Sequence, residues 1–308
     1  MASPSDITIV IPVKNREALI LRCLDSVAAQ TAKPADVIVV DNGSTDGTVK
    51  AVESWGALHP DIPLRILSES TPGAAAARNK GLDSVKTEYV YFMDSDDEML
   101  PSLLQKASAA IGDADLICWK AVCIGLDGKK RQKPFHIHHL IHRQFYNAVL
   151  STQVFLARTS LIREVGKWNE KALVWNDWEL GIRIAIAGPK CKSLPENLIV
   201  IHSQAESITG PDFSHKEGEW EKTFAIVARD ILDSPLNIRQ KKRLLDLLSY
   251  RKMILAATYR KEKNLSAARK LMKEIESDEK LGTFDRLRLK LLYHYTALGG
   301  RGAYYFWK

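Results

Sequence analysis

The sequence predicts an α/β protein in which helices flank a mostly parallel central sheet and a helical extension follows at the C-terminus. Short apolar segments with strand character alternate with helical segments over the first 120 residues. This alternation is typical of right-handed βαβ units, whose parallel strands are buried on both faces. Polar residues follow several of the apolar segments, and residues from Ser214 onward show only helical periodicity.

The elements of the first hundred residues can be placed one after another. The near-continuous apolar run Ile7–Val13 predicts a buried strand, and leucines at helical spacing predict a helix over Ala18–Ala29. The same pattern then repeats along the chain. The further predicted elements are strands at Val37–Val40 and Leu64–Leu67, a strand that ends at Asp94, and helices from Thr45 to about Leu58 and over Gly73–Val85.

The middle of the chain is mixed and its end is helical. The candidate strands of the middle part are Leu116–Cys118, Gln153–Ala157 and Leu198–His202. The predicted helices of the end are Ile238–Arg260, Ser266–Glu276 and Asp285–Leu298. We therefore expect one α/β domain over residues 1–214 and a separate basic helical region over residues 215–308.

Composition is that of a soluble globular protein, with 45% apolar and 26% charged residues. No run of about 18 apolar residues exists and the N-terminus lacks a basic leader segment, so we expect neither a transmembrane helix nor a secretory signal. The four cysteines show no paired CxxC spacing, which favours reduced thiols over a disulfide or zinc framework. These features predict a cytoplasmic protein.

Charge is unevenly distributed along the chain. Residues 215–308 contain 21 Lys and Arg against 12 Asp and Glu, a net charge of +9, whereas the remaining residues contain 23 against 25, a net charge of −2. All of the basic excess therefore belongs to the C-terminal third. Such asymmetry indicates an anionic partner for that region, either membrane phospholipid or nucleic acid.

The stretch Tyr89–Asp97 carries the strongest functional signal. Its apolar half fits a buried strand, but burial does not explain the three carboxylates Asp94, Asp96 and Asp97. Carboxylates this close repel one another unless a cation or a donor-rich ligand lies between them. Oxygen ligands at a strand end suit Mg²⁺ or Mn²⁺, with substrate phosphates completing the shell. The alternative is a polar turn that caps a helix beginning near Pro101.

Further polar residues occur where a parallel sheet binds ligands, beyond the carboxyl ends of its strands. Asn15, Asp41 and Asp94 each follow or end a predicted strand. Asp41 could accept hydrogen bonds from a nucleotide base, or belong to a plain capping turn. Arg78 and Asn79 follow a run of alanines that lets a helix pack closely. The planar donor fork of Arg78 suits a phosphate or nucleotide, although a surface arginine on that helix is the alternative.

Tryptophans and carboxylates occur together between residues 166 and 179. Aromatic faces are platforms for sugar rings, and a partly desolvated aspartate such as Asp177 can serve as a general base. Tryptophans are also common core residues, which is the alternative for each of them. The residues concerned are Trp168, Trp175, Asp177, Trp178 and Glu179.

Histidines give two weaker patterns. His202 follows a predicted strand and could add an imidazole to a metal shell, although a lone histidine at such a position is more often structural. Four of the eight histidines lie within residues 136–142, without the cysteine partners of a closed zinc site. We interpret that cluster as a variable loop or helix near an acceptor.

These segments, in this order, resemble the family 2 glycosyltransferases with the GT-A fold. The resemblance covers about residues 5–210 and leaves the C-terminal region outside. It implies a nucleotide-sugar half over about residues 1–100 and an acceptor half over about residues 101–214. The four linked blocks that carry it are Ile9–Asn15, Val39–Asp46, Gly73–Gly81 and Asp94–Asp97.

The resemblance also implies roles for individual residues. Asp41 and Arg78 would hold the nucleoside base of the donor, and Asp94 would face the ribose. Asp96 would bind the divalent metal, Mn²⁺ or Mg²⁺, that bridges the diphosphate. Asp177 matches the catalytic base of the family.

Other positions complete the expected site. Asn176 stands where the family often has Glu. This departure would alter contacts with the acceptor but leaves the proposed base, Asp177, intact. His202 with Ser207-Ile208 resembles a late element that closes over the diphosphate, and His202 would join the metal shell. The remaining expected nucleotide-sugar contacts are Pro12, Asn15, Asn79 and Ser95, and the expected acceptor contacts are Asp97, Trp175, Trp178 and Glu179.

The implied reaction is a metal-dependent, inverting transfer of a hexosyl type. A metal neutralises the diphosphate that leaves a nucleotide sugar, most simply a UDP-sugar, while Asp177 takes the proton from an acceptor hydroxyl. One in-line displacement then inverts the anomeric centre without a covalent intermediate. The acceptor implied is a saccharide or a lipid-linked molecule in bacterial surface polysaccharide synthesis.

Two other functions are open alternatives. A catalytically inactive sugar-nucleotide-binding protein would be expected to lose Asp96 or Asp177, and both are present. A sugar nucleotidyltransferase would need a Gly-rich basic loop after the first strand, and residues 14–17 contain no Gly.

The C-terminal helices are interpreted as amphipathic segments on an anionic membrane surface, which would make the protein peripheral on the inner face of a membrane. Arg286, Arg288 and Lys290 alternate with leucines, and the chain ends in the aromatic and basic run Tyr304–Lys308. The alternative is that these helices pack on the catalytic domain with solvated Lys and Arg outside. Nucleic acid is not expected, because no recognition motif is evident.

Overall fold

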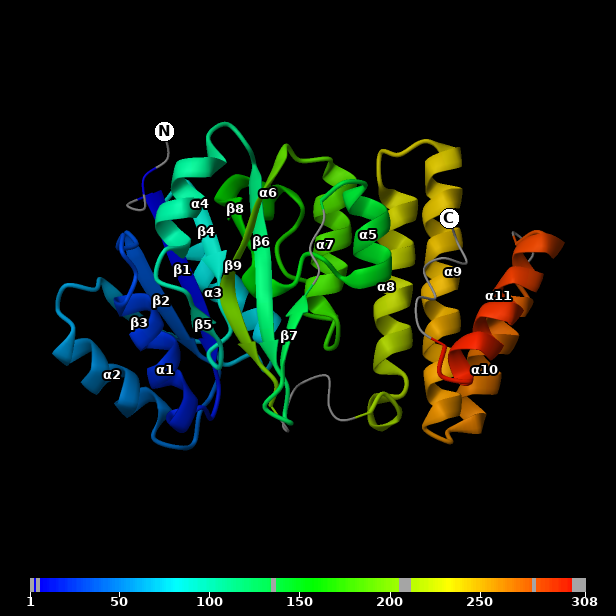
Figure 1. The fold of residues 1–308 in the computed structure, drawn as a ribbon, viewed down its shortest axis with the longest axis horizontal. Coiled ribbons are helices and arrows are strands. Elements are labelled where there is room, and N and C mark those ends of the chain that lie inside the picture. The colour runs from blue at the N-terminus through cyan, green and yellow to red at the C-terminus, as the bar shows by residue number, and fades with distance from the viewer. Residues whose placement is uncertain (1–2, 4–5, 134–136, 205–211, 279–280, 301–308) are drawn as a thin grey trace. The chain divides into compact units, whose positions relative to one another are not determined.

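The computed structural model describes residues 3, 6–133, 137–204, 212–278 and 281–300 (Figure 1). The chain divides into two compact units, an N-terminal unit of Met1–Arg143 with Ala148–Gln204 and a helical unit of Gln144–Asn147 with Ala205–Lys308. The boundary predicted between residues 214 and 215 stays a prediction. The α/β fold predicted from the sequence is confirmed, because the N-terminal unit contains a central sheet flanked by helices.

In the N-terminal unit, strands and helices alternate over residues 7–92, as the sequence predicts for this part of the chain, and the order is less regular after residue 92. Its strands are β1 (Ile7–Val13), β2 (Asp36–Asp41), β3 (Leu64–Ser68), β4 (Tyr89–Phe92), β5 (Glu98–Met99), β6 (Leu116–Ile124), β7 (Lys130–Lys133), β8 (Phe155–Arg158) and β9 (Cys191–His202). Its helices are α1 (Glu17–Ala28), α2 (Thr48–Leu58), α3 (Ala74–Asp83), α4 (Leu103–Ile111), α6 (Thr159–Glu164) and α7 (Asn176–Ala187), and α5 (Leu140–Asn147) crosses the division between the units.

The described strands form one sheet in the order β3-β2-β1-β4-β8-β6-β9-β5, with β7 beside β6. The first four strands of this order pair in parallel. Beyond β4 the sheet is mixed, because β8 is antiparallel to both β4 and β6 while β6 and β9 are parallel. Every side chain of β1 and β4 is buried, as expected for strands whose two faces are both covered.

Helices α2 and α3 show how local chemistry sets the start of one helix and the packing of another. Helix α2 begins at Thr48 rather than Thr45, because the Asp46 carboxylate accepts a hydrogen bond from the Thr48 amide, 3.0 Å, and so caps the helix from outside. Helix α3 packs on β1 and β2 through its alanines and Gly81. This close approach positions Arg78 near the carboxyl ends of the strands.

In the described part of the helical unit, four long helices follow the short 3₁₀ turn Ser214–Lys216. They are α8 (Glu219–Asp233), α9 (Ile238–Lys261), α10 (Leu265–Glu276) and α11 (Thr283–Ala297). Helix α9 packs against the other three, and its buried side chains include Leu248, Tyr250 and Tyr259. Within the described parts of the chain, we find no helix with the length and apolarity that crossing a bilayer requires.

Gly81 provides a test of the contact between α3 and the sheet. A Cβ at this position would overlap Val10 Cγ1 and lie 3.2 Å from Val40 Cγ2, both in buried strands. We expect Gly81→Ala to lower the free energy of unfolding by about 1–3 kcal/mol through overpacking, measured by urea denaturation.

Gly56→Ala in α2 is the matched control. Its added Cβ would lie 2.9 Å from Leu64 Cδ2, the end of a flexible side chain, and alanine favours the helix by about 1 kcal/mol. If Gly81→Ala were as stable as the unsubstituted protein, the tight contact of α3 with β1 would be refuted.

Candidate active site

Sheet topology brings three of the predicted residues to one edge. Strand β1 pairs in parallel with β2 on one side and with β4 on the other, so the order of the chain reverses at β1. Ligands of open α/β sheets bind beyond the carboxyl ends of the strands at such a reversal. Asn15 follows β1, Asp41 ends β2 and Asp94 follows β4, so all three lie at that edge.

Asn15 and Asp41 organise the loop between β2 and α2. Asn15 has a left-handed backbone, φ 50°, and its Oδ1 accepts a hydrogen bond from the Thr45 amide, 2.8 Å. The Asp41 carboxylate accepts from the amides of Gly43 and Ser44, at 3.3 and 3.2 Å. Both side chains thus have local partners that fix the loop, in line with the capping alternative for Asp41.

Arg78 is buried at the centre of the site. Its guanidinium donates to Asp94 Oδ1 at 2.6 Å, contacts Asn176 Oδ1 at 3.5 Å and lies over the Trp168 ring, 4.4 Å from the ring centroid. The side chain is only 6% exposed, which excludes the alternative of a surface arginine. A buried cation requires such partners, and here they join α3 to β4 and to the start of α7.

The neighbouring Asn79 forms a structural bridge. Its amide donates to the Trp168 carbonyl at 2.9 Å and to Glu170 Oε1 at 2.8 Å, while its oxygen accepts from the Trp168 amide at 3.0 Å. Both ends of the side chain are therefore occupied. Pro12 and Ser95 are the other two residues predicted to contact the nucleotide sugar. Pro12 is buried in β1, and Ser95, between Asp94 and Asp96 in the sequence, is also buried.

Gln153 joins two of the carboxylates that follow β4, and the sequence patterns did not single it out as a functional residue. Its Nε2 donates to Asp94 Oδ2 at 3.0 Å and also to Asp97 Oδ2. Its own carbonyl accepts from Tyr91 Oη at 3.0 Å and from Trp119 Nε1 at 3.1 Å, so two core aromatics hold its backbone in place. The Gln153 amide carries two N–H donors and lies between the carboxylates of Asp94 and Asp97. It therefore reduces the repulsion between these two side chains that the sequence predicts.

The carboxylates remain electrostatically crowded. Burial, followed by the charge of Asp94, raises the pKa of Asp96. Burial, Asp94 and Asp96 raise the pKa of Asp97 well above its usual range, although hydrogen bonds from the His202 amide and Gln153 oppose this. An added cation would favour the ionised forms of both groups.

The fit of a divalent metal rests on Asp96. Among the described residues no group of three histidine, cysteine or acidic side chains is arranged to hold a metal ion. Asp94 is paired with Arg78, and Asp97 is 1% exposed and bonded to Gln153. Among the described residues, no side chain donates a hydrogen bond to the Asp96 carboxylate, whose pKa is raised by burial and by Asp94. One carboxylate with substrate phosphates is a common Mg²⁺ arrangement.

His202 and the predicted acceptor residues have other partners. His202 Nε2 lies 2.5 Å from Glu98 Oε1, and the His202 amide donates to Asp97 Oδ1 at 2.8 Å. Glu179 is fully buried and forms a bidentate pair with Arg183, at 2.6 and 2.7 Å. Trp178 is also fully buried, so neither it nor Glu179 presents side-chain surface to an acceptor.

Asp177 is the second residue of α7 and is half-buried. Burial raises its pKa, whereas the charges of Lys133 and Arg78 and the Trp178 amide, which donates to Asp177 Oδ1 at 2.8 Å, lower it. Lys133, at the end of β7, donates to Ser151 Oγ at 2.6 Å, and burial lowers its pKa. Trp175, the residue before the helix, has a left-handed backbone with φ 51° and is half-buried. A half-buried aspartate beside two cations suits a general base.

Some predicted features lie outside the described residues. They include His136 of the histidine cluster and Ser207-Ile208, which form with His202 the late sequence element of the resemblance. The described part of the histidine cluster leads into α5. His139 directly precedes this helix and His142 lies in it, and their ring centroids are 6.4 Å apart.

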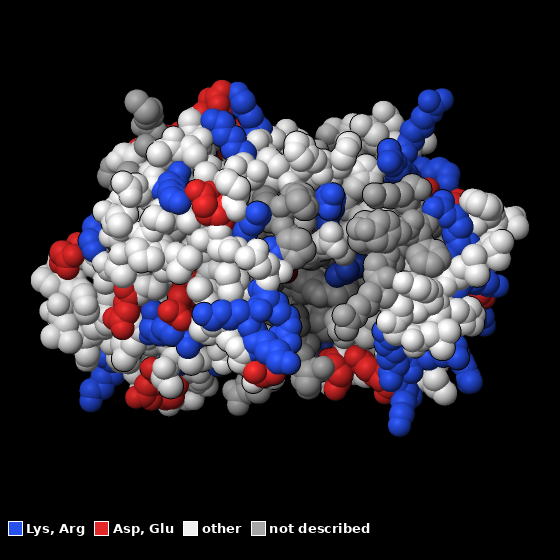
Figure 2. Space-filling view, viewed as in Figure 1, with Lys and Arg blue, Asp and Glu red and all other residues white. Residues whose placement is uncertain are grey.

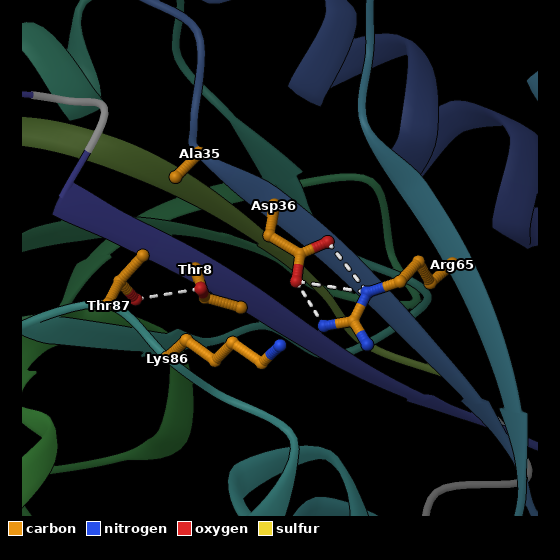
Figure 3. Close-up of a pocket in the computed structure, with 6 residues that line it drawn as sticks. All are labelled: Thr8, Ala35, Asp36, Arg65, Lys86 and Thr87. Atoms are coloured by element: carbon orange, nitrogen blue, oxygen red, sulfur yellow. Dashed lines mark hydrogen bonds and ion pairs between the residues drawn. The ribbon is translucent and has the colours of Figure 1, made fainter.

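A surface pocket of about 340 Å³ lies at the opposite edge of the sheet (Figure 3). Thr8, Asp36 and Arg65 line it from the amino ends of β1, β2 and β3, and Asp36 pairs there with Arg65. The clustered carboxylates follow the carboxyl end of β4, which is parallel to β1, so this pocket is not part of the candidate active site.

Comparisons with known proteins agree with this geometry. The family model described as "Glycosyl transferase family 2" matches residues 8–163. The amylovoran biosynthesis glycosyltransferase AmsB of Erwinia amylovora is 28% identical over 211 residues, which are 63% of this chain and 69% of AmsB. Several other similar glycosyltransferases are longer, and the chain matches only 13 to 33% of their length.

Solved structures with the same fold include two nucleotide-sugar complexes. S. aureus TarS 1–349 in complex with UDP-GlcNAc gives a TM-score of 0.74 at 19% identity, covering 95% of this chain and 87% of TarS 1–349. The mannosyltransferase PcManGT from Pyrobaculum calidifontis in complex with GDP-Man and Mn²⁺ gives a TM-score of 0.60 at 20% identity, covering 99% of this chain and 87% of PcManGT.

Gln153→Glu tests the role of the bridging amide. The substitution keeps the side-chain shape but replaces two donors by a carboxylate facing Asp94 and Asp97. We expect the free energy of unfolding at pH 7 to fall by about 1–3 kcal/mol, because buried acceptors lose their partner and like charges approach. Gln132→Glu, exposed on β7, is the control and should change stability by less than about 0.5 kcal/mol. Equal stability of the two variants would contradict the bridging role.

Proposed function

The chain belongs to glycosyl transferase family 2, and on this basis we propose that it transfers a sugar from a nucleotide diphosphate sugar to an acceptor hydroxyl with inversion at the anomeric carbon. The observation that carries the proposal is the position of Arg78. Its buried guanidinium contacts Asp94 on one side and Asn176, next to Asp177, on the other. Arg78 therefore connects Asp94, proposed for the donor, with the residue that precedes the proposed base.

The donor is proposed to be a UDP-sugar bound with Mn²⁺ or Mg²⁺. The similar TarS 1–349 was solved with UDP-GlcNAc and PcManGT with GDP-Man and Mn²⁺, which supports a nucleotide sugar and a divalent metal here. Asp96 would hold the metal together with diphosphate oxygens, and His202 is a second candidate ligand. When bound, the metal would supply charge neutralisation for the leaving diphosphate.

Asp177 is proposed as the general base. The acceptor oxygen forms a bond to the anomeric carbon as the bond from that carbon to the diphosphate oxygen breaks, and the hydroxyl proton passes to Asp177. The charges of Lys133 and Arg78 oppose the rise in the pKa of Asp177 that burial causes. Asn176, which accepts from Arg78, contributes to the orientation of the base.

The acceptor is proposed to be a saccharide or a lipid-linked molecule of a bacterial surface polysaccharide pathway. The name of the similar AmsB, an amylovoran biosynthesis glycosyltransferase, supports a biosynthetic role of this kind. The basic helical region would bring the protein to an anionic membrane surface, where lipid-linked acceptors are found. An inactive sugar-nucleotide-binding protein is the competing function.

Asp177→Asn tests the proposed reaction. The amide keeps the size of the side chain but cannot accept a proton, so we expect turnover to fall by at least about 100-fold. The measurement is nucleoside-diphosphate release across a panel of UDP- and GDP-sugars, with and without Mn²⁺, using oligosaccharide acceptors.

Nucleotide binding by Asp177→Asn, followed by calorimetry with UDP and Mn²⁺, should remain within about threefold of the unsubstituted protein, since Asp177 lies outside the proposed donor contacts. Unchanged turnover in the variant would refute Asp177 as base. Tight UDP binding without turnover of any sugar nucleotide by the unsubstituted protein would favour the inactive binding protein.

Lys133 provides a second test through the pH dependence. Its positive charge lowers the pKa of Asp177, so removing it should raise that pKa further. The base is active when ionised, and the acid limb of the pH profile of kcat/KM should therefore move to higher pH in Lys133→Met. Lys133→Arg, which retains the charge, should leave the limb close to its original position. An acid limb that does not move in Lys133→Met would show that Lys133 does not act on the base.

A further inference from the structure

Helix α11 has two apolar faces. One face is buried within the helical unit through Leu289, Leu292 and Tyr293. The other is exposed and comprises Phe284, Leu287 and Leu291 together with Leu298, the residue directly after the helix; these residues are 70, 55, 54 and 88% exposed. Spacings of three, four and seven residues place these four side chains in one row along the helix. We call this row the α11 stripe.

Basic residues border the α11 stripe. At 100° per residue, Arg288 falls on one side of the row and Lys290 on the other. The Arg288 guanidinium lies over the Phe284 ring, 5.8 Å from its centroid, while Lys290 forms a partly exposed ion pair with Glu276 at 3.1 Å. Within α11 (Thr283–Ala297), the single acidic residue is Asp285, in the first turn.

The surface of the helical unit has the same character around this helix. Figure 2 shows Lys and Arg side chains beside uncharged surface where Figure 1 draws α9 and α11. Residues 215–308 carry a net charge of +9 in the sequence. An apolar row with cations on both sides is the arrangement of a helix that lies in the interface of a membrane.

We propose that the α11 stripe binds the surface of an anionic lipid bilayer, with α11 parallel to the membrane plane. The apolar side chains would enter the boundary between headgroups and acyl chains, and Arg288 and Lys290 would contact lipid phosphates. A second copy of the chain is the competing occupant. It is disfavoured because two regions of charge +9 repel each other, whereas an anionic surface attracts them.

This inference deepens the proposed function and rests on it in one respect. A stripe bound to lipid would keep the catalytic unit near acceptors that are anchored in the membrane. Attachment itself does not require catalysis, because none of the four side chains belongs to the proposed active site. The two proposals can therefore fail separately.

The test is co-sedimentation of the full chain with vesicles at low salt. We expect binding to vesicles of phosphatidylglycerol and phosphatidylcholine, and much weaker binding to phosphatidylcholine alone, with the difference lost at high salt. The double variant Leu287→Gln/Leu291→Gln should bind at least roughly tenfold more weakly, because two apolar side chains no longer leave water. Leu58→Gln is the matched control, since Leu58 is 78% exposed at the end of α2 and outside the α11 stripe.

Two further measurements show whether a loss of vesicle binding comes from the stripe itself or from misfolding of the double variant. Circular dichroism and thermal unfolding of the double variant establish that it is folded, and nucleoside-diphosphate release with a soluble acceptor should match that of the unsubstituted protein. No sedimentation of the unsubstituted protein at low salt, or equal sedimentation of the double variant, would overturn the proposal. A concentration-dependent dimer in analytical ultracentrifugation that the double variant abolishes would assign the stripe to a second copy instead. A failure of vesicle binding with intact transfer would leave the proposed reaction standing.

Discussion

Repulsion among Asp94, Asp96 and Asp97 is the constraint that shapes the N-terminal unit. Three carboxylates within four residues would oppose folding if each lacked a partner. The structure meets this with donors from separate segments, namely Arg78 from α3, Gln153 from the 3₁₀ helix Thr152–Val154 and the His202 amide at the end of β9. The charges that would bind a substrate cation therefore also connect distant parts of the chain.

Much of this fold follows from local patterns in the sequence. Near-continuous apolar runs predicted β1 and β2, because both faces of a parallel strand are buried. The positions of Asn15, Asp41 and Asp94 were predicted because the carboxyl ends of parallel strands lie at one edge of the sheet. Gln153 and Lys133 were not predicted to act with them, because their roles depend on long-range pairing. Strand β8 must pair with β4, and β7 with β6, before either side chain approaches the carboxylates.

Sequence spacing also cannot separate residues that line a site from those that support it. Glu179 and Asn79 stand in motifs with residues that we propose for the active site, yet the side chains of both are occupied by structural contacts. Glu179 pairs with Arg183 one helical turn later, and Asn79 bonds to the backbone of Trp168. The resemblance to a family assigns an approximate role to a motif. Burial and the partners of each polar atom decide which members of the motif remain available to a ligand.

The two kinds of charge in this chain act on different partners. Arg78 and Lys133, whose charges act on Asp94 and on the proposed base, belong to the N-terminal unit, as does Gln153, whose amide donates to Asp94 and Asp97. The basic excess of the sequence belongs to residues 215–308. In our proposals the acidic cluster attracts a cation and the basic helical unit attracts an anionic surface, so each retains the charge that its own ligand requires.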